Sequence, residues 1–134
     1  MFINDGHVAP YHVEWLNGLE DAAKAYDEAF GNVEASWLSA EASLEKMIEQ
    51  TEATINEEPD VMFVNAINTE AFVPLIEQAQ DKGITWVAVH SPMPEADYSF
   101  TLGDIQNGTS TGLAMCALLP EGSTTAIMLG APGN

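Results

Sequence analysis

Short apolar runs alternate along this chain with longer segments of helical periodicity. The apolar runs predict strands over residues 1–3, 32–38, 61–64, 84–89, 98–102 and 125–129. Between them apolar residues recur every three or four positions, the spacing of one helix face, and predict helices over residues 11–30, 44–55, 69–82 and 107–119. Alternating strands and helices with short links form right-handed crossovers between parallel strands. We therefore predict an α/β fold, a three-layer, doubly wound parallel sheet of the flavodoxin-like kind with five to six strands and four helices.

Several single residues sharpen this prediction. The continuous apolar run 61–64 is typical of a parallel strand that is covered on both faces. Asn68 is suited to cap the start of the third helix, and Gly83 is suited to the left-handed residue that follows its end. Trp37 and Trp86 lie within expected strands, so we predict that both belong to the core.

Composition excludes several classes of protein. The chain has 21 Asp and Glu against 3 Lys and no Arg, a net charge of −18, which disfavours binding to nucleic acid or to anionic membranes. No apolar run reaches the roughly 18–20 residues of a membrane helix, and no signal peptide opens this sequence. The single cysteine, Cys116, excludes an internal disulfide and a multi-cysteine metal site, and its apolar neighbours predict a buried side chain.

Candidate binding residues lie where ligands bind in such sheets, beyond the carboxyl ends of the strands. These positions are residues 4–12, 65–68 and 90–91. Asn65 and Asn68 are interpreted chiefly as loop and cap residues, with ligand contact as the alternative. Trp15 either packs within the first helix layer or forms the wall of a pocket.

Catalysis and metal binding are not expected. Glycine-rich phosphate loops and the Gly-x-Ser-x-Gly motif are absent. His90 and Ser91 are adjacent on an extended chain, where successive side chains point apart, so they do not form a nucleophile–base couple. His7, His12 and His90 with Asp5 are residue types that zinc accepts, but no closely spaced pair supports such a site. We predict a non-enzyme without metal or cofactor.

The order of local motifs resembles a known family. The matching stretches are Pro10-Tyr11, 18–23, 59–64, 65–68, 79–87, Gly103-Asp104 with Gly108, and 130–134. Together they are similar to the periplasmic sugar-binding proteins of the ribose-binding type, the solute receptors of bacterial ABC importers. Proteins of this kind close a sugar between two lobes of the type I periplasmic binding protein fold.

The resemblance implies a domain organisation, a ligand, a partner and a cellular location. Residues 1–103 correspond to the N-terminal lobe with a truncated first strand, and residues 104–134 to the hinge and the first helix and strand of the second lobe. A small sugar-like ligand, a membrane permease as partner, a periplasmic or extracellular location and function by hinge closure are then expected.

The resemblance also implies a set of site residues. The expected ligand-binding residues are Asn4, Asp5, Tyr11, His12, Trp15, His90 and Ser91. Tyr11 stands where the family stacks an aromatic ring on the sugar. His90 and Ser91 stand where the family usually has an Asp-Arg pair, so the identity of the ligand stays open. Asp104 matches the aspartate of the family's hinge pair, although Ile105 replaces the asparagine.

Two alternatives remain open from the sequence. The chain could be the effector-binding core of a sugar-responsive transcription regulator, because those domains share the fold. It could also be a self-standing half-domain that forms a homodimer through its incomplete second-lobe segment, because that helix and strand have no lobe of their own on which to pack.

Overall fold

The computed structural model describes residues 2–4, 10–101 and 103–126 of the chain. The strands are β1 (Phe2–Asn4), β2 (Trp37–Ser39), β3 (Val61–Val64), β4 (Thr85–Val89) and β5 (Tyr98–Phe100). The helices are α1 (Pro10–Phe30), α2 (Leu44–Asn56), α3 (Thr69–Asp81) and α4 (Asp104–Leu118). The chain forms two compact units, Met1–Phe100 and Thr101–Asn134. That the first unit is one lobe of a larger receptor stays a prediction.

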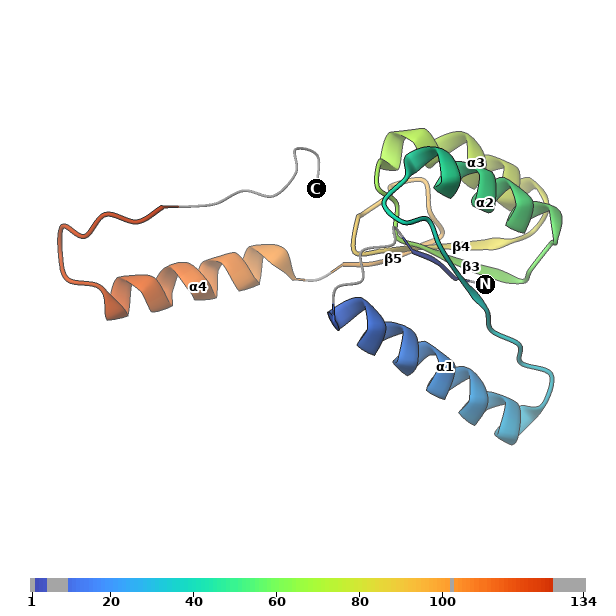
Figure 1. The fold of residues 1–134 in the computed structure, drawn as a ribbon, viewed down its shortest axis with the longest axis horizontal. Coiled ribbons are helices and arrows are strands. Elements are labelled where there is room, and N and C mark those ends of the chain that lie inside the picture. Colours follow the sequence, from blue (N-terminus) through green and yellow to red (C-terminus); the bar gives the residue numbers. More distant parts are fainter. Residues whose placement is uncertain (1, 5–9, 102, 127–134) are drawn as a thin grey trace. The chain divides into compact units, whose positions relative to one another are not determined.

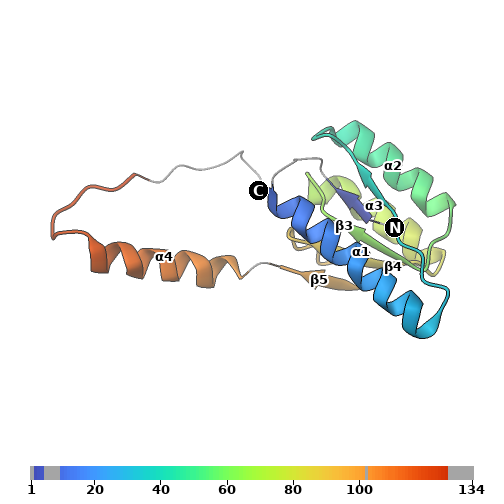
Figure 2. The same ribbon diagram turned by 60° about the horizontal axis from the view of Figure 1, so that its bottom comes forward.

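The first unit is built on a parallel sheet with the strand order β2-β1-β3-β4-β5. Helices α2 and α3 cover one face of this sheet, and α1 lies on the other (Figures 1 and 2). The chain moves from β1 outward to β2 and then returns to the far side of β1 with β3, so the winding direction changes between β1 and β3. The predicted three-layer, doubly wound fold is therefore confirmed.

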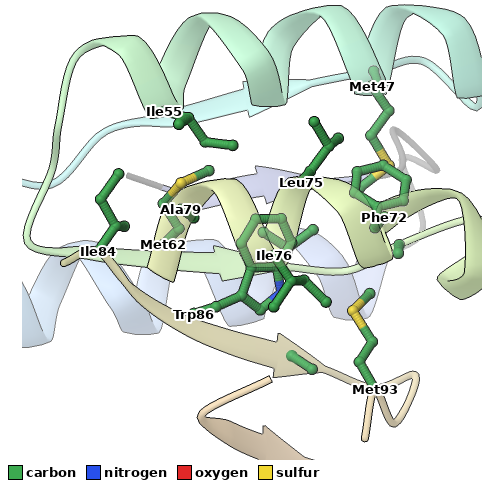
Figure 3. Close-up of a cluster of buried hydrophobic side chains, with 14 residues drawn as sticks. Met47, Ile55, Met62, Phe72, Leu75, Ile76, Ala79, Ile84, Trp86 and Met93 are labelled. Atoms are coloured by element: carbon green, nitrogen blue, oxygen red, sulfur yellow. The ribbon is translucent and has the colours of Figure 1, made fainter. Parts of the chain in front are cut away.

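The core lies between the sheet and the pair α2 and α3 (Figure 3). Because side chains alternate along a strand, Met62 and Val64 of β3 are buried on this side while Phe63 lies on the α1 side and is half-buried. Trp86 of β4 is fully buried, as predicted, and its ring lies 6.4 Å from that of Phe72 on α3. The remaining large members of this core are Met47, Ile55, Leu75, Ile76, Ile84 and Met93.

Local signals set the ends of α2 and α3. The Ser43 hydroxyl accepts a hydrogen bond from the backbone N–H of Lys46 at 3.2 Å and caps α2. Asn68 caps α3 in the same way, with its Oδ1 accepting from the N–H of Ala71 at 3.2 Å. Gly83 has a φ of 78°, the left-handed conformation expected after the helix end. The two sequence predictions for α3 are confirmed.

The second strand corrects the sequence prediction. Residues 32–36 are irregular and only Trp37–Ser39 form β2, which lies at the edge of the sheet. Trp37 is consequently 47% exposed rather than part of the core, and its Nε1 donates to Glu20 Oε1 at 3.2 Å. An edge strand has one neighbour and fewer elements over its faces, so an apolar residue on it is not necessarily buried.

The first helix is less buried than its periodicity predicts. Tyr26 and Phe30 belong to the apolar stripe of α1 yet are 61% and 76% exposed. A cavity of about 700 Å³ is lined by α1 residues, among them Leu19 and Ala23, together with Phe63 of β3. The apolar stripe of α1 therefore faces the sheet, but its side chains do not fill the space between the helix and the sheet.

The C-terminal unit also departs from expectation. Cys116 on α4 is exposed, whereas its apolar neighbours predicted burial. Among the described residues of this unit α4 is the only regular element, so the unit holds no second layer that could cover the cysteine. Residues 125–126 show no strand, and the rest of the strand predicted over 125–129 lies outside the described residues.

Replacing phenylalanine by alanine should lower the free energy of unfolding by different amounts in the two helical layers around the sheet. Phe72→Ala empties a fully buried site between α3 and β4, so it should lower the free energy of unfolding by about 3–5 kcal/mol. Phe30→Ala, the matched control on α1, should change it by no more than about 0.5 kcal/mol. Urea denaturation followed by circular dichroism measures both. Equal losses would contradict the assignment of the core to the α2 and α3 side.

Candidate functional site

The carboxyl ends of the central strands bring two loops to the same edge of the sheet. β3 and β4 are paired in parallel, with Val64 opposite Ala88. Asn65 follows β3 directly and is 6% exposed, while His90 follows β4 and is half-buried. Asn65 therefore lies next to the change in winding direction, where doubly wound sheets bind ligands, and His90 lies one strand further along the same edge.

His90 occupies a strained turn at the end of β4. Its φ is 63°, a conformation that costs a non-glycine residue free energy. The N–H of Ser91 donates to the carbonyl of Val89 at 2.7 Å, closing a three-residue γ-turn around His90. The N–H of His90 donates to the carbonyl of Phe100 at 2.8 Å, which ties the turn to the end of β5. Two backbone hydrogen bonds thus hold the backbone of His90 in this conformation.

Trp15 on the second turn of α1 faces this imidazole. The ring centroids of Trp15 and His90 are 6.0 Å apart with the rings inclined by 51°, and both side chains are half-buried. Trp15, Gly18, Val89 and Phe100 contribute to the lining of a cavity of about 430 Å³ beside this pair. Trp15 therefore forms part of an open, largely apolar depression between α1 and the ends of β4 and β5, and the His90 ring lies beside Trp15.

Electrostatically this depression is almost neutral. Among the described residues that line it, Glu14 is the one charged side chain, and it is exposed. Glu14 is therefore screened by solvent. Trp15 offers an aromatic wall in this depression, and imidazole, amide and hydroxyl groups follow the neighbouring ends of β3 and β4. Together they supply the chemistry needed to hold a polar molecule with an apolar face.

The structure brings together three of the seven residues predicted to bind ligand. Trp15 and His90 are in ring contact, and Ser91 closes the same turn. The backbone of Asn4 ends β1, next to β3.

The other predicted residues are not tested by the structure. Tyr11 and His12 lie in the first turn of α1, and their side chains, like that of Asn4, are outside the described residues, as is Asp5. Asp104 begins α4 in the second unit, with an undescribed side chain. The hinge role of Asp104 stays a prediction.

Phe100 is a site residue that the sequence reasoning did not select. Its carbonyl anchors the turn at His90, and its side chain helps line the cavity next to Trp15. The signal was present, because a strand over 98–102 was predicted and successive parallel strands are usually neighbours in such a sheet. Their carboxyl ends then meet at one edge.

The described part of the chain contains no group of three or more His, Cys, Asp and Glu side chains arranged to hold a metal ion. His7 and Asp5 lie outside that part. Within the described helices, none combines the length and apolar character needed to cross a membrane.

Parallel strands with polar and aromatic groups after their carboxyl ends are the arrangement in which α/β proteins bind ligands. Residues 1–134, the whole chain, match the periplasmic binding protein domain. The chain therefore belongs to the periplasmic binding protein family. No curated protein sequence matches it.

Several solved structures share its fold. One is the sugar-binding protein of a sugar ABC transporter from Bacillus halodurans, with a TM-score of 0.75 and 23% identity over 88% of this chain and 40% of that chain. An ABC sugar transporter subunit from Rhodobacter sphaeroides 2.4.1 has a TM-score of 0.65 and 23% identity, covering 87% and 40%. A solute binding protein of an ABC transporter from Clostridium phytofermentans, solved with bound β-D-glucose, has a TM-score of 0.66 and 17% identity, covering 87% and 36%. This chain thus spans 36% to 40% of the length of these structures.

The strain at His90 predicts a difference between two substitutions. His90→Gly and His90→Ala both remove the ring that contacts Trp15, but only glycine adopts the positive φ without steric cost. We expect His90→Gly to be more stable than His90→Ala by about 1 kcal/mol. Thermal unfolding of the two variants measures the difference. Equal stability would show that the turn relaxes when the imidazole is absent.

Proposed function

We propose that this chain is the N-terminal lobe of a sugar receptor of a bacterial ABC importer, similar to proteins of the ribose-binding type. The observation that carries the proposal is the convergence of Trp15 and His90 beside the depression at the carboxyl edge of the sheet. The proposal is also supported by the family and by three relatives of the same fold. Two of these are components of ABC sugar transporters, and the third is an ABC transporter solute binding protein with bound β-D-glucose.

The chemistry of the site suits a sugar. The faces of a sugar ring carry C–H groups that pack on an aromatic surface, while its hydroxyls need donors and acceptors. Trp15 supplies the surface, and the hydroxyl of Ser91 and the imidazole of His90 supply hydrogen-bonding groups of both kinds. The expected set is completed by Asn4 at the end of β1, by Asp5, and by Tyr11 and His12 in the first turn of α1.

The mechanism is closure of two lobes around the ligand. A ligand that touches both lobes stabilises the closed state by its differential affinity for that state, and a membrane permease then recognises the closed receptor. Asp104, which matches the aspartate of the family's hinge pair, is the residue we propose for the hinge. In this role the protein acts in the periplasm or outside the cell, and it catalyses no reaction.

The importer receptor is favoured over the two other functions that the sequence left open. The three relatives described above are transporter components, and none is a transcription regulator. The homodimer through the C-terminal segment stays a prediction.

Substitution of two tryptophans tests the site. In the full-length receptor, Trp15→Ala should weaken binding of the best ligand among D-glucose, D-galactose, D-xylose and D-ribose by about 5- to 30-fold, because a stacked aromatic ring is worth on the order of 1–2 kcal/mol. Trp37→Ala on the edge strand β2 is the matched control and should leave the Kd unchanged. Isothermal titration calorimetry measures both.

The opposite result for the Kd would show that Trp15 does not contact the ligand. An unchanged Kd in Trp15→Ala, with normal thermal stability, would leave Trp15 as a packing residue. Failure of the wild-type receptor to bind any neutral or charged saccharide would reject the sugar-receptor proposal itself.

A further inference from the structure

We propose that Asp97 is a positioning residue of the candidate site, and that it holds the turn at His90 in place from the opposite end of β5. The inference rests on the proposed sugar-binding function and adds to it a residue outside the depression. It follows from how little burial holds β5, from the hydrogen bonds that Asp97 makes to its neighbours, and from the bond between the end of β5 and His90.

Strand β5 has little burial to hold it in position. Tyr98 and Phe100 are 63% and 66% exposed, and the strand lies at the edge of the sheet, paired with β4 alone. Residues 90–97 join β4 to β5 without a helix, although parallel strands are usually joined by a helix that packs on the sheet. Met93 packs in the core and holds the middle of this connection (Figure 3). The position of β5 along β4 therefore depends on specific contacts at its two ends.

Asp97 supplies the contact at the first end. Its Oδ2 accepts a hydrogen bond from the backbone N–H of Trp86 at 2.7 Å, and its Oδ1 accepts from Gln80 Nε2 on α3 at 3.2 Å. Gln80 Nε2 also donates to the carbonyl of Glu95 at 3.0 Å. The paired part of β5 begins opposite Val87, one residue after Trp86. The carboxylate of Asp97 thus takes the place of a strand carbonyl for the N–H of Trp86.

These hydrogen bonds fix the register between β4 and β5. Trp86 is fully buried, so its N–H would be costly to leave without an acceptor. A hydrogen bond to an ionised acceptor is also stronger than one between neutral groups. A shift of β5 by one residue would move Asp97 by about 3.3 Å and break both contacts. Asp97 therefore favours the register in which Phe100 lies opposite Val89.

This register places the acceptor that holds the turn. With Phe100 opposite Val89, the Phe100 carbonyl accepts a hydrogen bond from the N–H of His90 at 2.8 Å. This bond helps to hold the φ of 63° at His90, which the residue does not prefer. Phe100 also lines the same cavity as Trp15, whose ring centroid lies 6.0 Å from that of His90. Loss of the register would therefore displace the imidazole and one wall of the depression together.

Substitution of Asp97 tests the inference in the full-length receptor. Asp97→Ala should weaken binding of the sugar that binds best in the series above by about tenfold, because fewer molecules hold the turn in place and the Kd rises in proportion. Asp97→Asn keeps an oxygen that can accept the N–H of Trp86, so its Kd should stay within about threefold of the wild-type value. Glu95→Ala is the matched control, because it removes a carboxylate from the same connection while Glu95 bonds to Gln80 through its carbonyl. It should leave the Kd unchanged in isothermal titration calorimetry.

A second measurement separates positioning from stability. Amide hydrogen exchange, followed by NMR, reports directly on the N–H of His90 that donates to Phe100. Asp97→Ala should accelerate exchange at His90 by about tenfold more than at the amides of β3, and Asp97→Asn should not. Ile55→Val removes a methyl group from the core beneath α2 and lowers stability without a change near β5. This variant should alter neither the Kd nor the exchange at His90 relative to β3.

Each result separates the inference from the proposed function. An unchanged Kd in Asp97→Ala overturns the inference, and so does a weaker Kd without faster exchange at His90. An equal loss of affinity in Glu95→Ala also overturns it, because the loss would then follow the charge of the connection. If Asp97→Ala does not fold, Gln80→Ala removes one donor to the carboxylate, and an unchanged Kd and exchange in that variant overturn the inference.

In all these cases the wild-type receptor binds its sugar and the proposed function stands. Failure of the wild-type receptor to bind any saccharide rejects the proposed function and, with it, the role of Asp97 in the site.

Discussion

The structure depends on burying both faces of the two central strands. β3 and β4 are apolar along their length, so alternate side chains must be covered from opposite sides. Met62 and Trp86 pack beneath α2 and α3, while Phe63 and Val89 lie on the side of α1. Parallel pairing is required by crossovers of this kind, and it places the loops after both strands at one edge. The candidate site is therefore a consequence of how the core is built.

The two helical layers on either side of the sheet have different roles in this arrangement. The α2 and α3 side holds the fully buried cluster and fixes the sheet, and its helix ends are set by local caps (Figure 3). The α1 side carries the cavities and the half-buried Trp15. A binding surface needs exposed groups held by a rigid frame, and this division supplies both. The strained turn at His90 fits the same division, because hydrogen bonds to β4 and β5 hold a backbone conformation that the residue does not prefer.

The charge distribution follows the fold closely. The acids Glu45, Glu49 and Glu52 lie on the exposed side of α2, where water screens them. Lys82 pairs with Glu58 at the amino-terminal edge of the sheet, and Lys46 pairs with Glu41 at the start of α2. The depression beside Trp15 is lined mostly by uncharged residues, with Glu14 as the exception among the described ones.

Local sequence patterns determined α2, α3, the Asn68 cap, the left-handed Gly83 and the alternation of helices and strands. These features depend on residues within a few positions of one another, so a single sequence carries the information. Only the tertiary structure decided that Trp86 is buried while Trp37 is exposed, because both tryptophans lie in similar strand patterns and differ in whether their strand is central or at the edge. It also decided that Trp15 faces His90 and that Phe100 anchors the turn. Such contacts join residues far apart in the chain, and they depend on the order of strands in the sheet, which no local periodicity encodes.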